Sequence, residues 1–174
     1  KLPPSGRATR ILTCWPTAPS GLAVEEGLNV RLCDLRLGHQ PALAGIKHLN
    51  RLENVLARAE WQDPEIHEGL LLDQDGRVVS GVMSNVFIWS QDRLMTPRLH
   101  RCGVAGVTRS RLVRLARTEN LAVEEVDLEL EEVMQAQELM FCNSLWGLRR
   151  AVRLGARSWN HPAISPRLIA LLDA

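Results

Sequence analysis

Residues 85–109 read Asn-Val-Phe-Ile-Trp-Ser-Gln-Asp-Arg-Leu-Met-Thr-Pro-Arg-Leu-His-Arg-Cys-Gly-Val-Ala-Gly-Val-Thr-Arg, and this stretch decides the fold. It begins with an apolar run that is typical of a buried strand, and Arg93–Thr96 predicts a second, short strand. A glycine-bearing loop at 103–108 follows, and a helix is expected over Thr108–Thr118. Backbone N–H groups at a helix N-terminus, together with the Thr108 hydroxyl, form a natural cradle for phosphate. Taken alone the signal is weak, because most loops of this kind are only turns.

Strands and helices are mixed on both sides of this stretch. Asp75-Gly76 is a hairpin signal between an arm at Gly69–Asp73 and a longer arm at Val78–Trp89. Further strands are expected at Ala8–Trp15, Leu28–Leu37, Val123–Val126, Glu138–Cys142 and Leu148–Leu154, and further helices at Leu128–Gln135 and Ser165–Leu172. The pattern places the chain in the α/β (mixed α+β) class.

Lys47 stands out because arginine carries almost all of the other positive charge. Of the 21 Lys+Arg residues, only Lys1 and Lys47 are lysines. Apolar residues flank Lys47, and the apolar spacing over Leu49–Ala59 predicts an amphipathic helix just after it. A desolvated lysine amine can lose its proton and attack a carbonyl, which arginine cannot do. Two interpretations stay open here: amine chemistry, or a lysine whose stem lies along apolar surface.

The composition describes one domain of ordinary size. The 174 residues are 45% hydrophobic and 24% charged, as in folded globular proteins. A net charge of +1 gives no electrostatic reason to expect nucleic acid or a membrane surface as a partner, and no apolar run is long enough to span a bilayer. The four cysteines include no Cys-x-x-Cys pair, which argues against a metal site such as zinc and favours a reducing, cytoplasmic setting.

Three motifs occur in a fixed order, namely Asn85–Phe87, Leu94–Thr96 and Val104–Arg109. At this spacing they reproduce most of the signature of the class IV, or fold-type IV, pyridoxal-phosphate enzymes, and the chain strongly resembles that family. Residues 44–53 (Ala-Gly-Ile-Lys-His-Leu-Asn-Arg-Leu-Glu) resemble the 4-amino-4-deoxychorismate lyase branch, and Cys142–Gly147 supports the same branch.

The resemblance implies a fold, a cofactor and a site. It implies the large C-terminal domain of a homodimeric enzyme that binds pyridoxal 5'-phosphate. Lys47 would form the Schiff base and then remove the substrate's proton, with the cofactor ring as electron sink. The small-molecule substrate 4-amino-4-deoxychorismate would give pyruvate and p-aminobenzoate, which feeds folate synthesis. The cofactor-binding residues implied in this way are Lys47, Val107, Thr108, Asn143 and Ser144. For Arg51, one helical turn after Lys47, two interpretations stay open: a contact with the cofactor, or a solvated residue of the helix.

One position departs from the family pattern. Ser80 stands five residues before Asn85, where the family carries a Glu that pairs with the pyridine nitrogen of the cofactor. A hydroxyl cannot supply that charge, so slower proton abstraction is expected unless another carboxylate, such as Glu68, reaches the ring.

The family also carries an N-terminal domain before the equivalent of this chain. Residues 1–18 are therefore expected to be a remnant of that domain (its last strand), 19–25 a linker, and 26–174 the C-terminal cofactor-binding domain. Two alternatives to the lyase remain: an aminotransferase of branched-chain or D-amino acids with the same fold, and a catalytically silent fragment.

Overall fold

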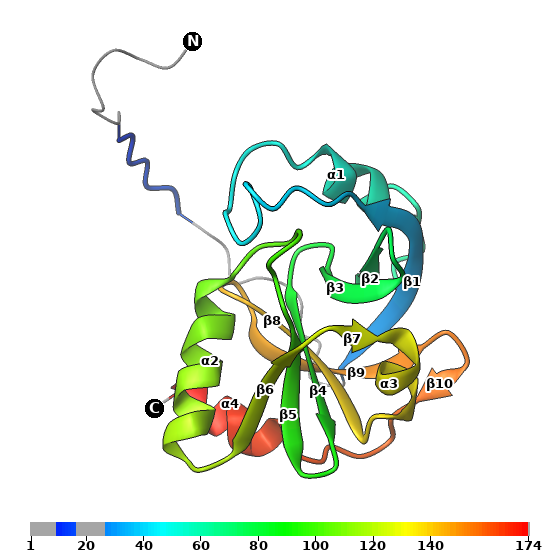
Figure 1. Cartoon of the computed structure of the whole chain (residues 1–174), viewed down its shortest axis with the longest axis vertical. Coiled ribbons are helices and arrows are strands. Elements are labelled where there is room, and N and C mark those ends of the chain that lie inside the picture. The colour runs from blue at the N-terminus through cyan, green and yellow to red at the C-terminus, as the bar shows by residue number, and fades with distance from the viewer. Residues whose placement is uncertain (1–9, 17–26, 174) are drawn as a thin grey trace.

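The computed structural model describes residues 10–16 and 27–173, and these form a mixed α/β fold (Figure 1). The strands are β1 Leu28–Leu37, β2 Glu68–Asp73, β3 Arg77–Gly81, β4 Asn85–Ser90, β5 Arg93–Pro97, β6 Ala122–Val126, β7 Leu128–Glu129, β8 Glu138–Asn143, β9 Gly147–Leu154 and β10 Arg157–Ser158. The helices are α1 Leu52–Arg58, α2 Val107–Thr118, α3 Leu130–Gln135 and α4 Ser165–Asp173. The predicted fold class is confirmed. None of the described helices is both long and apolar enough to cross a membrane.

The strands form one nearly closed sheet in the order β6-β5-β4-β8-β9-β1-β2-β3-β7. Strand β9 joins its two halves, because residues 147–150 pair with β8 and residues 151–154 pair with β1. The strands at the two ends of this order, β6 and β7, are separated in sequence only by Asp127. Helix α2 connects the parallel neighbours β5 and β6, which fixes the position of its N-terminus at one end of the sheet.

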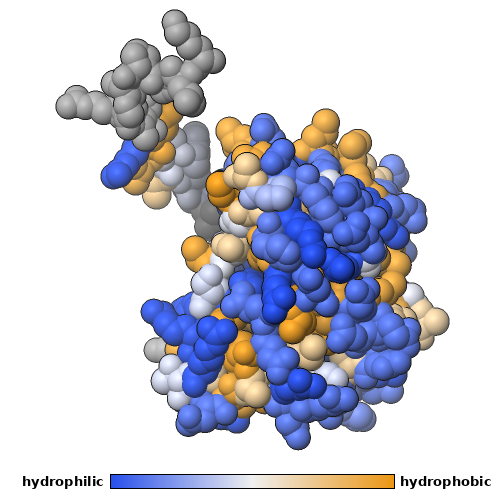
Figure 2. Space-filling model, in the orientation of Figure 1, coloured by the Kyte–Doolittle hydropathy of each residue, from blue (hydrophilic) through white to orange (hydrophobic). Residues whose placement is uncertain are grey.

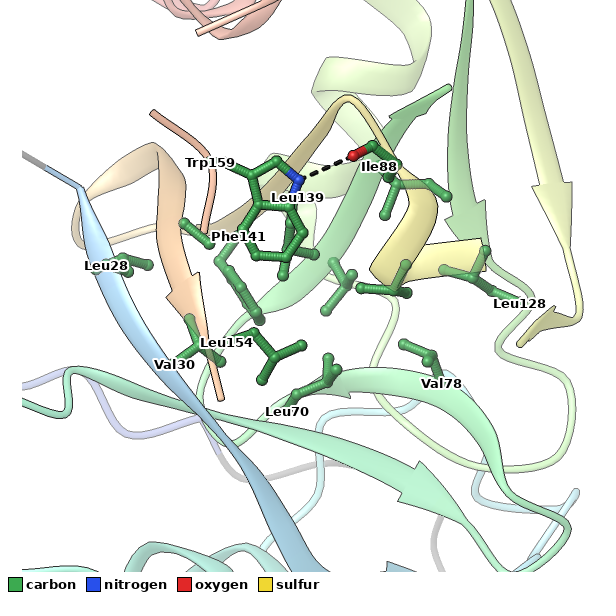
Figure 3. Packing of buried hydrophobic residues seen from close by; sticks show 14 of the residues in the cluster. Leu28, Val30, Leu70, Val78, Ile88, Leu128, Leu139, Phe141, Leu154 and Trp159 are labelled. Carbon is green, nitrogen blue, oxygen red and sulfur yellow. Dashed lines mark hydrogen bonds between the residues drawn. The ribbon is translucent and has the colours of Figure 1, made fainter. Parts of the chain in front are cut away.

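Strand β4 is buried on both faces, and its side chains alternate between two cores. Val86 and Ile88 point into the curved sheet, whereas Phe87 and Trp89 pack under α2 and α4. Figure 3 shows the inner core, where side chains from β2, β8 and β9 converge below Trp159. The outer core brings α2 and α4 together on one side of the molecule (Figure 1).

The prediction that the second arm of the hairpin is one long strand is wrong. The antiparallel hairpin of β2 and β3 exists, but β3 ends at Gly81 and a separate strand, β4, begins at Asn85. The break is a turn in which the Gly81 N–H donates to the Ser84 carbonyl at 2.9 Å. Beyond it, β4 pairs with β5 and β8, in the other half of the sheet.

The strand predicted at Ala8–Trp15 is not formed in its described part. Residues 10–15 are exposed and pair with no described strand, and Ala8 and Thr9 lie outside the described residues. A strand needs a neighbour for its backbone N–H and C=O groups, and no described segment supplies one there. The assignment of 1–18, 19–25 and 26–174 to separate regions stays a prediction.

Two helix predictions also need correction. The helix predicted at Leu128–Gln135 begins only at Leu130, because Leu128 and Glu129 pair with β3 as β7. The helix predicted over Leu49–Ala59 is shorter, Leu52–Arg58, and most of its apolar face points outward. Leu52, Val55 and Leu56 are more than half exposed, and Leu49, which lies before the helix, is 100% exposed. Figure 2 shows hydrophobic side chains on the surface at this end of the molecule. Spacing identifies an apolar face but not the side on which its partner lies.

Candidate functional site

A cavity of about 550 Å³ opens between the Lys47 loop, the β3–β4 turn, the N-terminus of α2 and the β8–β9 turn. Ligand pockets in proteins commonly measure roughly 300 to 1,000 Å³, so this cavity suits a cofactor or small molecule. The structure brings all seven residues predicted for the site to its walls: Lys47, Arg51, Ser80, Val107, Thr108, Asn143 and Ser144.

The Lys47 loop is fastened to the glycine loop before α2. Gly45 forms an isolated bridge with Val104: its N–H donates to the Gly103 carbonyl, and its own carbonyl accepts from Ala105 N–H, both at 3.0 Å. Gly45 has a φ of +78°, which L side chains rarely adopt. These bonds hold Lys47 beside the start of α2. Lys47 itself is exposed.

Asn85, the first residue of the 85–109 stretch, fixes the shape of the same glycine loop. Its side-chain amide donates to the Val104 carbonyl at 2.8 Å, and its Oδ1 accepts from the Gly106 N–H at 3.2 Å. A Cβ on Gly106 would clash with Asn85 Oδ1, so glycine is required for this approach. Asn85 therefore fixes the path of the chain into α2.

The N-terminus of α2 is open toward the cavity. No described side chain caps it, its first turn contains no acidic residue, and Val107 is 75% exposed. The first N–H groups of a helix lack partners within the helix, and the helix dipole favours an anion there. The donors at Val107 and Thr108 thus fit a phosphate group, as the resemblance implies.

The remaining motif residues orient α2. The buried Arg109 guanidinium donates from Nε to Thr96 Oγ1 at 3.2 Å and from Nη2 to Glu125 Oε2 at 2.8 Å. The Thr96 hydroxyl donates in turn to the Val86 carbonyl at 2.8 Å. This chain ties α2 to β4, β5 and β6, and the hydrogen bond from Arg109 lowers the pKa of Glu125. Glu125 belongs to none of the sequence motifs, and its contact with Arg109 was not predicted from the sequence.

Glu125→Gln is expected to lower the free energy of unfolding by about 1 kcal/mol at neutral pH, a value reduced because Glu125 is partly exposed. Since the folded-state pKa is lowered, the ion pair stabilises the protein above the ordinary pKa and is lost as the pH falls through the lowered value. Urea unfolding should show a difference in the free energy of unfolding between the two proteins at neutral pH, and this difference should disappear in acid. The same difference at both pH values would show that it does not come from the ion pair of Glu125 with Arg109.

Ser80 and Glu68 occupy different places at the β3–β4 turn. Ser80 is on the cavity wall, although only 5% exposed, whereas Glu68 is 0% exposed, lies behind Gly81 and is not on that wall. Glu68 accepts hydrogen bonds from the Ser84 hydroxyl at 2.7 Å and the Val82 N–H at 3.0 Å. Burial raises its pKa, although these bonds oppose the shift. Glu68 thus holds the turn, and its predicted approach to the cofactor ring is not supported by its position.

Two side-chain amides close the remaining walls. Asn143 Oδ1 accepts from the Leu145 and Trp146 N–H groups at 2.9 and 3.0 Å, which fixes the β8–β9 turn beside Ser144. Asn54, on α1, donates to the Val82 carbonyl at 2.8 Å. Asn54 is a wall residue that sequence reasoning missed, because a buried polar residue on a helix carries no pattern of its own.

Comparison with known proteins gives the family context of this geometry. The model of the amino-transferase class IV family matches residues 3–154. Aminodeoxychorismate lyase from Vibrio harveyi is 38% identical over 124 residues, which cover 71% of this chain and 46% of that protein. A putative branched-chain-amino-acid aminotransferase from Methanocaldococcus jannaschii is 36% identical over 135 residues, covering 77% of this chain and 46% of that protein.

Solved structures agree. The crystal structure of 4-amino-4-deoxychorismate lyase from Pseudomonas aeruginosa superposes with a TM-score of 0.83 at 41% sequence identity, covering 85% of this chain and 55% of that chain. This chain therefore spans about half the length of the relatives that it matches.

Proposed function

Because this chain belongs to the amino-transferase class IV family, we propose that it binds pyridoxal 5'-phosphate and converts 4-amino-4-deoxychorismate to p-aminobenzoate and pyruvate. The observation that carries the proposal is the placement of Lys47 at one cavity beside the uncapped N-terminus of α2. A reactive amine and a phosphate cradle are the two protein parts that this chemistry needs.

The residues divide the work by their chemistry. The N–H groups and hydroxyl at Val107 and Thr108 would hold the phosphate, and the Asn143–Ser144 turn would border the cofactor in the same cavity. Lys47 Nζ would hold the cofactor covalently and, when free, would accept the proton from the amine-bearing carbon of the substrate. The cofactor, when bound, supplies the electron sink for the charge that this proton leaves behind. Ser80 offers a hydroxyl where a carboxylate would hold positive charge on the ring, so we expect slow turnover.

The lyase is preferred over an aminotransferase because of residues 44–53 and the lyase relatives, at 38% and 41% identity. The aminotransferase of branched-chain or D-amino acids is the second candidate, since an aminotransferase relative reaches 36% identity. The two reactions share the proton removal by Lys47. They differ in their co-substrates, because transamination requires a keto acid that accepts the amino group and the lyase reaction does not.

The test uses the 174-residue chain with added pyridoxal phosphate and 4-amino-4-deoxychorismate. We expect a visible absorption band from cofactor bound to the protein, and pyruvate release with no keto acid present. Pyruvate release that occurs only with a keto acid present, or transfer of the amino group to that keto acid, would favour the aminotransferase. Cofactor binding without either reaction would leave the catalytically silent fragment as the better account.

The proposal extends to assembly and setting. We propose a homodimer that acts in the cytoplasm, in folate synthesis, without a nucleic-acid or membrane partner. Exposed apolar residues support self-association, namely Ile46, Leu49, Leu52, Val55 and Leu56 on and before α1. Sedimentation of the same preparation should give a dimer, and a monomer at micromolar concentration would contradict this part of the proposal.

A further inference from the structure

The cavity contains one positive charge to which the proposed function assigns no role. Of the described residues on its walls, only Lys47 and Arg51 are ionisable as cations, and none carries a carboxylate. Lys47 is committed to the cofactor in the proposed function, and the phosphate has the N–H groups of α2. Arg51 therefore remains as a permanent cation facing a cavity without acids.

Arg51 lacks an internal partner. Within residues 10–16 and 27–173, its guanidinium makes no hydrogen bond to another residue and lies within 4.0 Å of no carboxylate. The nearby Glu53 carboxylate instead accepts the Gly38 N–H at 2.9 Å. Burial lowers the pKa of Arg51, while Glu53 and Cys102 only oppose that shift. A half-buried cation of this kind is stabilised when an anion pairs with it.

The backbone of Arg51 is fixed at the start of α1. Its carbonyl accepts from Val55 N–H at 3.1 Å, and its own N–H donates to the Leu49 carbonyl at 2.8 Å. The helix is held against the cavity wall by the Asn54 bond to Val82 and by the buried Ala57. The guanidinium is thus presented from a rigid element, which favours a defined binding geometry over a chance approach.

We propose that Arg51 binds a carboxylate of the substrate and selects anionic over neutral amines. The inference rests on the proposed function, since 4-amino-4-deoxychorismate carries one carboxylate on the ring and one on its enolpyruvyl group. Guanidinium pairs with carboxylate through two parallel hydrogen bonds, which a lysine cannot reproduce. The phosphate of the cofactor is the other anion that could use this cation, and the test separates the two.

The probes are p-aminobenzoate and its neutral isostere p-aminobenzamide, titrated calorimetrically into the cofactor-loaded chain. Arg51→Met should raise the Kd of p-aminobenzoate about tenfold or more, and Arg51→Lys should give an intermediate value. The Kd of p-aminobenzamide and that of pyridoxal phosphate should stay unchanged. Arg111→Met, at an exposed position of α2, should match the parent protein in every titration.

Two results would overturn the inference. One is equal p-aminobenzoate affinity in the parent and the Met variant, including no binding to either. The other is a loss of pyridoxal-phosphate affinity with p-aminobenzoate binding retained, which would assign Arg51 to the phosphate. The proposed function is tested separately by pyruvate release. If the parent protein distinguishes the two probes through Arg51 but releases no pyruvate, the inference about Arg51 stands and the proposed lyase activity is wrong.

Discussion

Lys47→Ala should abolish the visible absorption band of bound cofactor and lower the rate of pyruvate release at least about 1,000-fold. The reason is that, in the proposed function, one Nζ both attaches the cofactor and accepts the substrate proton, and Lys1 is the only other lysine in the chain. Absorption spectroscopy after addition of pyridoxal phosphate, followed by a pyruvate assay, measures both effects. The fold should be unaffected, because Lys47 is exposed and has no packing role.

Two matched variants separate charge from chemistry. Lys47→Arg keeps the positive charge at the cavity but cannot form the Schiff base, so it should behave like Lys47→Ala. Lys1→Arg leaves Lys47 as the sole lysine and should behave like the parent. A normal absorption band in Lys47→Arg would show that another amine holds the cofactor, and the assignment of Lys47 would then be wrong.

Glu138→Ala should lower the free energy of unfolding by about 3–5 kcal/mol, a large part of a typical domain's stability. The Glu138 carboxylate is 0% exposed at the start of β8 and accepts hydrogen bonds from the backbone N–H groups of Ala163, Ile164 and Ser165 at 2.8–3.0 Å. The Ser165 hydroxyl donates to it as well. Truncation would leave the buried donors at the start of α4 without an acceptor.

The control for this effect is Glu119→Ala. Glu119 is exposed, and its ion pair with Arg167 on α4 measures 3.5 Å, so its loss should change stability by less than about 1 kcal/mol. Urea unfolding followed by tryptophan fluorescence compares the two variants, because the buried Trp159 reports on the inner core. A similar, small effect for both would contradict the role of Glu138. Since α4 packs under α2, partial loss of α4 in Glu138→Ala should also weaken the phosphate binding that we propose at the N-terminus of α2.

The sequence allowed the strand and site pattern around residues 85–109 to be predicted because local chemistry controls it. A continuous apolar run indicates the buried strand β4, and a glycine loop before a helix needs no distant partner to be recognised. Lys47 was found by its residue type, its apolar neighbours and the resemblance of residues 44–53 to a known branch of the family. Its position beside α2 depends on the bridge from Gly45 to Val104, which joins segments about sixty residues apart and leaves no local pattern.

Features set by distant contacts could not be predicted. The hairpin arm was predicted too long because strand-forming residues, among them Val79, Val82 and Val86, stand on both sides of the break at Gly81. The turn between them is fixed in part by the distant Glu68, which the local sequence does not show. The same limit applies to Arg109, which reads as a surface residue of a helix but is buried against Glu125. The motif thus mixes residues at the cavity with residues that only shape it, and spacing does not separate them.

The most direct test of the central claim is borohydride reduction of the chain with pyridoxal phosphate, followed by peptide mapping by mass spectrometry. Reduction converts the Schiff base into a stable bond, so the cofactor mass should be found on the peptide that contains Lys47, and on no other. Recovery of the label on Lys1 or the N-terminal amine, with Lys47 unmodified at saturating cofactor, would contradict the account.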